Sequence, residues 1–333
     1  MSKNILAYIV SLLLLSGAIV LGVTIGTVSI SPVVLWNPAS DEAAANILWN
    51  IRMPRVVLAG LVGAALAIAG AAFQGLLKNP LADPYTLGVS SGASVGAVMT
   101  LFFGISIPFL GSFTLPVMSM IGALLTMILV MGFARLVDRS MKMETVILTG
   151  IIFSSFLGSI ISLMIALTGE ELRQIIGWLL GSVSMRGWPY VQMALPFILV
   201  GSFVLWLNRR ELNAMLFGEE RAQHLGVDVK KRKWSILIGG SVLTGAAVAV
   251  SGTIGFVGLV VPHMTRLVWG SDHRHLLPLS FINGAALLIV CDLVARTIIS
   301  PTELPIGVIT AFIGAPVFAF IFFRQRKGGA ANA

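Results

Sequence analysis

Residues 52–78 of the chain read 52-RMPRVVLAGLVGAALAIAGAAFQGLLK-78. Between Arg55 and Lys78 it carries no charge, so it is long enough to cross a bilayer as a helix, which takes about 20 residues. Similar runs recur along the chain, and of its 333 residues 57% are apolar and only 11% are charged. Soluble domains carry roughly 25% charged residues. The sequence therefore predicts an all-α polytopic membrane protein.

Hydropathy predicts about ten transmembrane helices in a single domain, residues 1–333. The predicted spans are 5–29, 52–77, 85–104, 114–137, 144–167, 189–207, 234–252, 256–268, 277–298 and 305–323. The span 256–268 is too short to cross alone, so we expect it to pack inside the bundle or beside a break. Residues 1–23 resemble a secretory signal, but their apolar stretch is long, and we expect it to be retained as the first helix.

Basic residues are distributed unevenly between the two ends of these spans. If Met1 faces the cytoplasm, 17 of the 22 Lys and Arg residues fall in cytoplasmic segments, and both termini are cytoplasmic. This bias accounts for the net charge of +8 without nucleic acid as a partner. Basic residues at the outer ends of spans run against this bias, which indicates an acidic partner outside the membrane. The five outer basic residues are Arg52, Arg55, Arg173, Arg186 and Arg296.

The segment Lys78–Pro84 (KNPLADP) is the sharpest local signal. Pro80 and Pro84 each disfavour helical geometry in the preceding residue, so one span ends here. Asp83 is then placed as the N-cap of the next helix, with Pro84 at its first position. As structure alone, this segment predicts a turn on the cytoplasmic side.

The span after this turn has a small, hydroxyl-bearing face, which suits either helix packing or the wall of a wide polar pathway. The candidate pathway residues are Gln74, Ser90, Ser91 and Ser94. A faint echo links 84-PYTLGV-89 with 305-PIGV-308, because each opens a span. Two four-span units of opposite orientation would form an inverted repeat, which is common among transporters.

The longest polar segment, residues 208–233, holds seven Lys/Arg and four acidic residues and is assigned to the cytoplasm. Glu219 and Glu220 begin a short helical stretch that Gly226 can end. Ala222 and Leu225 are three residues apart, which predicts that they share one face. The segment is either a short amphipathic helix for docking a soluble partner or a solvated loop.

Polar residues in and near the later spans allow several interpretations. Asp292 and Arg296 are four residues apart, so they can pair on one helix and are a functional candidate, or a pair that snorkels at the outer interface. Cys291, the only cysteine, is expected to pack as a small hydrophobe. His273 and His275 could suggest a metal site, but plain polar surface is favoured, so no metal and no cofactor are expected.

The motifs, taken together and in order, resemble FecCD-type permeases of type II ABC importers, which move iron chelates, haem and cobalamin. The resemblance covers the chain from about Arg52 to Phe323. The matching features are Arg52-Met-Pro-Arg55, Gln74, Asn79–Pro84, Leu87-Gly88, Gly218–Gly226, Gly255–His263, Asp272-His-Arg274, Asp292–Arg296, Glu303-Leu-Pro305 and Gly314-Ala-Pro316.

The resemblance implies a permease in the bacterial plasma membrane, in contact with lipid, and paired with a second permease subunit that is identical or paralogous. A cytoplasmic ABC ATPase dimer and an external substrate-binding protein are the implied partners. The residues that match the coupling helices, which enter the ATPase, are Gly218, Glu219, Glu220, Ala222, Leu225 and Gly226. The residues that match the binding-protein contacts are Arg52, Arg55 and Arg296.

In cobalamin-type relatives, the turn between the fourth and fifth spans carries small hydroxyl residues that close a cytoplasmic gate. The matching positions here are Met143 and Glu144, which depart from that pattern. The gate region is therefore expected there, without the relatives' gate chemistry.

These features together predict a translocation subunit and not an enzyme, with ATP hydrolysis on a separate chain, because no Walker-type run is present. A ferric siderophore is the expected substrate, and cobalamin or haem in the same importer class is the alternative. An ion-coupled secondary carrier is a remote alternative, because carriers usually need unpaired ionisable groups deep in the spans. A membrane-embedded enzyme is disfavoured for want of a nucleophile–base constellation.

Overall fold

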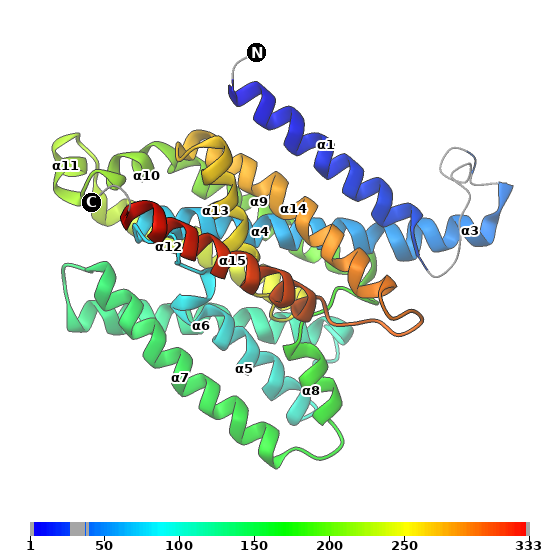
Figure 1. The fold of residues 1–333 in the computed structure, drawn as a ribbon. Coiled ribbons are helices and arrows are strands. Elements are labelled where there is room, and N and C mark those ends of the chain that lie inside the picture. The colour runs from blue at the N-terminus through cyan, green and yellow to red at the C-terminus, as the bar shows by residue number, and fades with distance from the viewer. Residues whose placement is uncertain (1–2, 27–36, 38–39, 331–333) are drawn as a thin grey trace.

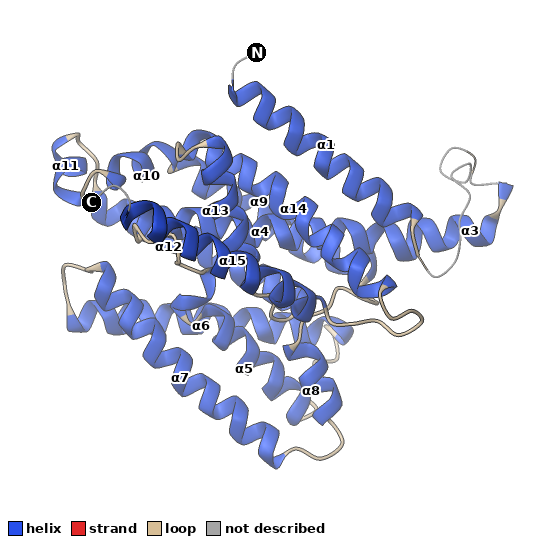
Figure 2. Cartoon of the chain, in the orientation of Figure 1, coloured by secondary structure: helices blue, strands red, loops and turns tan. Residues whose placement is uncertain are grey.

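The computed structural model describes residues 3–26, 37 and 40–330, and the side chains among them except at 320–322 and 324–330. These residues form helices and connecting loops without a strand (Figure 2). The helical elements are α1 (Lys3–Thr24), α3 (Glu42–Asn46), η2 (Ile47–Arg52), α4 (Met53–Leu76), η3 (Pro84–Leu87), α5 (Val89–Phe102), η4 (Gly111–Phe113), α6 (Thr114–Val137), α7 (Met143–Leu167), α8 (Leu172–Leu179), α9 (Gly187–Leu207), α10 (Arg209–Leu216), α11 (Glu219–His224), α12 (Val229–Ser251), α13 (Val257–Trp269), α14 (His273–Thr297) and α15 (Ile306–Ala330).

The long helices form one bundle with two distinct ends (Figure 1). One end carries α10 and α11 and is named the α11 end, and the other carries α3 and α8 and is named the α8 end. Each of the ten predicted spans coincides with a helix. In the described part of the chain, seven helices are long and apolar enough to cross a membrane, and α5, α13 and the apolar part of α15 are shorter.

This pattern confirms an all-α polytopic membrane protein, whereas the inverted repeat stays a prediction. Residues 27–29 of the first predicted span lie outside the described residues. The second span differs most from expectation. It was predicted to begin at residue 52, but a continuous helix runs from Glu42 through a π-helical turn into α4 and ends at Leu76.

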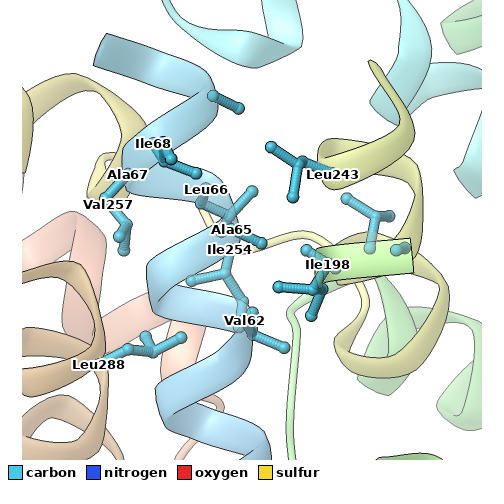
Figure 3. Packing of buried hydrophobic residues seen from close by; sticks show 14 of the residues in the cluster. Val62, Ala65, Leu66, Ala67, Ile68, Ile198, Leu243, Ile254, Val257 and Leu288 are labelled. Atoms are coloured by element: carbon cyan, nitrogen blue, oxygen red, sulfur yellow. The ribbon is translucent and has the colours of Figure 1, made fainter. Parts of the chain in front are cut away.

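α4 lies at the centre of the bundle because small residues let other backbones approach it. A Cβ atom added to Gly63 would clash with the carbonyl oxygen of Gly284 in α14, and one added to Gly70 would clash with that of Gly258 in α13. In lipid, where no hydrophobic force joins helices, such close contact supplies the attraction. Around this axis Figure 3 shows side chains from α9, α12, α13 and α14, namely Ile198, Leu243, Val257 and Leu288.

The predicted cap after α4 is confirmed, and the helix behind it starts later than predicted. Asp83 accepts a hydrogen bond from the backbone N–H of Tyr85 at 2.8 Å, and Pro84 opens the 3-10 turn η3. Gly88 then adopts a left-handed conformation with φ of 79°, so α5 starts at Val89 and not at residue 85. A left-handed position of this kind favours glycine.

The short span 256–268 behaves as expected. α13 follows a non-helical break and packs against α4 and α14. Tyr85 holds this break, because its hydroxyl donates to the carbonyl oxygen of Ile254 at 2.8 Å and accepts from the same residue's N–H at 3.0 Å.

α7 and α15 differ from α4 in how little of their apolar surface the subunit covers. The exposed large apolar side chains on α7 include Leu148, Ile151, Phe156 and Leu163, and those on α15 include Phe312 and Ile313. Such faces need lipid or a further protein surface to cover them.

Candidate functional site

The α8 end holds a cluster of charged side chains centred on Arg55, in the first turn of α4. Its Nε donates to both carboxylate oxygens of Asp292 at 3.0 Å, and its Nη2 donates to Asp292 Oδ1 at 2.9 Å. Its Nη1 donates to Glu303 Oε1 at 2.8 Å. Asp292 lies in α14 and Glu303 in the loop before α15, so Arg55 joins three parts of the chain.

Two further arginines, Arg52 and Arg296, lie near Arg55 and are buried. Arg52 is 4% exposed, and its Nη1 donates to the carbonyl oxygens of Val23 at 3.0 Å and Thr24 at 2.8 Å. Arg296 is 6% exposed, and its Nη2 donates to the carbonyl oxygen of Gly22. These carbonyls belong to the last turn of α1, where a helix leaves its acceptors without intrahelical donors.

The predicted ion pair of Asp292 with Arg296 is present, and Arg55 is a second, closer partner of the same carboxylate. The pairing with Arg296 along α14 is loose, at 3.8 Å between Arg296 Nε and Asp292 Oδ2, whereas Arg55 binds the same carboxylate through two nitrogens. Bidentate guanidinium–carboxylate pairs are the stronger geometry. Asp292 is therefore held mainly from α4, across the helix interface.

The side chains of this cluster differ in how exposed they are to solvent. Asp292 is 1% exposed and the Arg55 side chain 11%, whereas the Glu303 side chain is 37% exposed. Partial burial by itself raises the pKa of Glu303, but the hydrogen bond and charge of Arg55 outweigh it and hold that pKa below its ordinary value. The three guanidinium groups expected to contact a binding protein are thus engaged inside the subunit. Their docking role stays a prediction.

The other outer arginines lie on loops and helix ends of the α8 end. Arg173 in α8 is exposed. Arg186 caps α9 and lies over the ring of Tyr190, 5.1 Å from its centroid.

The candidate pathway residues are mostly interior to the subunit. Gln74 is buried; its Nε2 donates to the carbonyl oxygen of Leu259 at 3.0 Å, and its Oε1 accepts from Arg266 Nη1 at 3.2 Å. Ser90 and Ser94 are buried too, and only Ser91 is half-buried. Lining a pathway remains a prediction for all four, and Gln74 has a demonstrable role in joining α4 to α13.

The α11 end carries the predicted coupling segment. α11 spans Glu219–His224, so Leu225 lies just beyond the helix, where it is 72% exposed, whereas Ala222 is fully buried. The prediction that these two residues share one face is wrong, because the helix ends between them. Phe217, which was not among the predicted coupling residues, lies just before the first turn of α11 and is 70% exposed. An aromatic next to a glycine in an otherwise polar segment was the available signal.

The remaining coupling residues surround this short helix. Gly218 is its N-cap, Glu219 and Glu220 form its exposed first turn, and Gly226 follows Leu225 with φ of 83°. Apolar side chains therefore project from both ends of α11, and acidic ones from its first turn.

The coupling segment is tied to the expected gate region by one buried lysine. Lys233 Nζ donates to Glu219 Oε2 at 2.6 Å and to the carbonyl oxygen of Met141 at 3.4 Å. Met141 lies in the turn before α7, next to Met143 and Glu144, which open that helix as a half-buried and an exposed residue.

The histidines at this end serve helix packing. Asp272 caps α14, and its carboxylate accepts from Arg274 and from Asn213 Nδ2 at 2.7 Å; the hydrogen bond from Arg274 holds the pKa of Asp272 well below its usual range. His273 contacts Asn213 at 2.9 Å, and His275 contacts Asn4 at 3.1 Å. In the described residues, no group of three His, Cys, Asp or Glu side chains could hold a metal ion.

Comparison with known proteins agrees with this architecture. The chain is 61% identical over 335 residues to the ABC transporter permease protein YvrB of Bacillus subtilis, which covers 97% of this chain and 95% of the relative. It is 44% identical over 286 residues to the cobalamin import system permease protein BtuC of Halobacterium salinarum, which covers 86% and 75%.

A solved structure has the same fold along nearly the whole chain. An inward-facing metal-chelate type ABC transporter superposes with a TM-score of 0.85 at 32% identity, over 94% of this chain and 97% of that one. Residues 12–324 match the model of the FecCD transport family. The chain therefore belongs to the FecCD transport family.

Proposed function

We propose that this permease translocates a ferric-siderophore complex delivered by an external binding protein, using ATP hydrolysed by a separate cytoplasmic ATPase dimer. The family and the relatives named as ABC permeases make the chain the permease of a type II ABC importer, a transport protein. The observation that carries the proposal beyond the family is α11, which presents exposed Phe217 and Leu225 at the end opposite to the arginine cluster.

The distribution of charge supports one orientation of the permease in the membrane. The α11 end carries the basic residues of the turn 138–142 and of segment 208–233. Because basic residues concentrate on the cytoplasmic side, the α11 end faces the ATPase and both termini are cytoplasmic. The α8 end then faces the binding protein, across the plasma membrane of a bacterium.

The arginine cluster is the proposed docking region for the binding protein. Among the described residues, the ion pairs of Arg55 and Arg296 are made with two carboxylates, Asp292 and Glu303. Arg52 adds a third guanidinium group, which backbone carbonyls hold, so this region is rich in positive charge. Such a charge attracts an acidic protein surface from solution.

The uncovered faces of α7 and α15 support a second permease subunit as the partner within the membrane. A transport pathway between two subunits needs both of them to form its wall. α7 and α15 carry apolar surface that a second subunit would cover. We place the cytoplasmic gate at Met143 and Glu144, at the start of α7. Gln74, Ser90, Ser91 and Ser94 are kept as pathway candidates, with Ser91 the most accessible.

Cobalamin and haem are the alternative substrates in the same importer class. One relative is named for cobalamin import, and the structural neighbour is described as metal-chelate type, which is compatible with all three substrates. An ion-coupled carrier has less support. Asp292 is a buried acidic residue in a span, and Arg55 already neutralises it.

Two measurements test this function. Tagged permease should co-purify with its ATPase. Leu225→Ser should lower the affinity for the ATPase by about tenfold, as loss of an apolar interface anchor does, while Gln223→Ala, at an exposed residue of α11, should not. In the assembled complex, the binding protein loaded with the true substrate should stimulate ATP hydrolysis. Ferric siderophore, cobalamin and haemin are the three ligands to compare, and stimulation by cobalamin or haemin alone would reject the siderophore.

A further inference from the structure

We infer that Glu303 occupies, in the free subunit, the site on Arg55 that a carboxylate of the external binding protein takes on docking. The inference rests on the docking role proposed above for the arginine cluster. It makes the outer face of the permease a carboxylate-binding site that the chain fills with its own side chain until the partner arrives.

The two edges of the Arg55 guanidinium are not equivalent. The edge formed by Nε and Nη2 binds Asp292, which is almost fully buried, through three hydrogen bonds of 2.9–3.0 Å. Removing one partner from a buried pair leaves an uncompensated charge and is strongly unfavourable. Asp292 therefore stays bound and fixes where Arg55 points.

The remaining nitrogen, Nη1, faces an exchangeable partner. It donates to Glu303 at 2.8 Å and to Ser184 Oγ at 3.5 Å, and the Glu303 side chain is more than a third exposed. Ion pairs that water reaches contribute little to stability. A carboxylate offered from outside can therefore replace Glu303 at low cost, since one anion leaves Nη1 as another binds.

The backbone around Glu303 does not depend on its side chain. The N–H of Leu304 donates to the carbonyl oxygen of Ala295 at 2.9 Å, and the N–H of Ile306 donates to that of Gly181 at 3.0 Å. The side chain can thus swing into water while the backbone on its C-terminal side stays anchored to Ala295 of α14 and to Gly181, in the segment after α8.

The neighbouring arginines favour the exchange. Arg52 and Arg296 donate to backbone carbonyls of α1, which hold both guanidinium groups in place and leave their charge unneutralised. Once Glu303 leaves, Asp292 is the carboxylate among the described residues that still pairs with Arg55 and Arg296. The site becomes more positive as it opens, which strengthens its attraction for an acidic partner.

The test measures affinity for the external binding protein that stimulates ATP hydrolysis in the assay described above, with the permease–ATPase complex in nanodiscs. Glu303→Gln removes the competing charge and should tighten binding by roughly two- to fivefold, the size of one part-exposed ion pair. Glu170→Gln is the matched control, because Glu170 is an exposed glutamate in the outer loop between α7 and α8. In an Arg55→Ala background, the Glu303→Gln gain should disappear.

The outcomes separate this inference from the docking proposal. If Arg55→Glu leaves the affinity unchanged, the docking role itself is rejected. If Arg55→Glu weakens binding more than tenfold but Glu303→Gln matches Glu170→Gln or weakens binding, docking stands and the exchange is rejected. Thermal unfolding of each variant shows whether a loss of binding reflects a loss of fold.

Discussion

Gln74 of α4 supplies the hydrogen bond that Pro262 of α13 cannot make. Proline has no N–H, so the carbonyl oxygen of Gly258, four residues earlier, lacks its helical donor. Gln74 Nε2 lies 3.4 Å from this oxygen and 3.0 Å from the next carbonyl, that of Leu259. A residue that looks like a pathway candidate in the sequence thus completes a neighbouring helix.

This relationship predicts coupling between the two positions. Gln74→Met should destabilise the protein by about 1–3 kcal/mol, because it leaves a buried carbonyl without a donor. In a Pro262→Ala background the new N–H can reach Gly258, so the loss should shrink by about 1 kcal/mol. Unfolding in SDS mixed micelles measures the double-mutant cycle, and strict additivity would contradict the account.

Lys233 is predicted to couple ATPase binding to the gate region. Its ammonium group bridges Glu219 of α11 and the Met141 carbonyl before α7. Lys233→Met should therefore reduce substrate transported per ATP by about fivefold or more, as expected when an interaction of roughly 1 kcal/mol or more is lost. The exposed Lys230 gives the matched variant Lys230→Met. If both variants transport the same amount of substrate per ATP, the Lys233 bridge does not couple ATPase binding to the gate region.

The sequence predicted those features that depend on neighbouring residues. The ten spans follow from apolar runs, the Asp83 cap from two prolines and a short polar side chain, and the break before α13 from its length. Each of these depends on interactions within a few residues, which spacing rules describe well.

The cluster at the α8 end could be predicted only in part. Charge asymmetry identified Arg52, Arg55 and Arg296, and the i,i+4 rule predicted the ion pair of Asp292 with Arg296, but it missed the closer partner, Arg55. Arg55 and Asp292 are 237 residues apart in sequence, and the contact of α4 with α14 that joins them is tertiary. The shared face of Ala222 and Leu225 was wrong for a different reason, since α11 ends at His224 and Leu225, as its C-cap, is exposed while Ala222 is buried.

Asp83 is predicted to act through its oxygen atom and not through its charge. Burial raises the pKa of this carboxyl above its ordinary value of 3.8, although the hydrogen bond from Tyr85 partly offsets this. With a raised folded-state pKa, the charged form lowers stability above about pH 4, and this cost fades as the pH falls through the folded pKa. At pH 7, Asp83→Asn should match or exceed wild type in the free energy of unfolding.

Asp83→Ala removes the cap and should lose about 1 kcal/mol at the same pH. Denaturation curves at pH 7 and pH 4.5 measure both variants. A greater loss from Asp83→Asn than from Asp83→Ala would contradict this role.

Close packing on α4 predicts a position-specific effect of adding one methyl group. Gly63→Ala should destabilise by about 1–3 kcal/mol, because the new Cβ meets the backbone of Gly284. Gly17→Ala in α1 adds the same methyl group where no atom lies within 4 Å, and its effect should be within about 0.5 kcal/mol. Equal effects at the two sites, measured by thermal unfolding in detergent, would argue against the packing of α4 on α14.

Uptake into proteoliposomes measures whether this chain is the permease of an ATP-driven importer. The vesicles would contain the permease and its ATPase, with the ligand-loaded binding protein on the face opposite to the ATPase. Radiolabelled iron siderophore should accumulate only when ATP, an active ATPase and the binding protein are all present, and an ion gradient should not replace ATP. Uptake that persists with a hydrolysis-dead ATPase, or that an ion gradient alone drives, would contradict an ATP-driven importer permease.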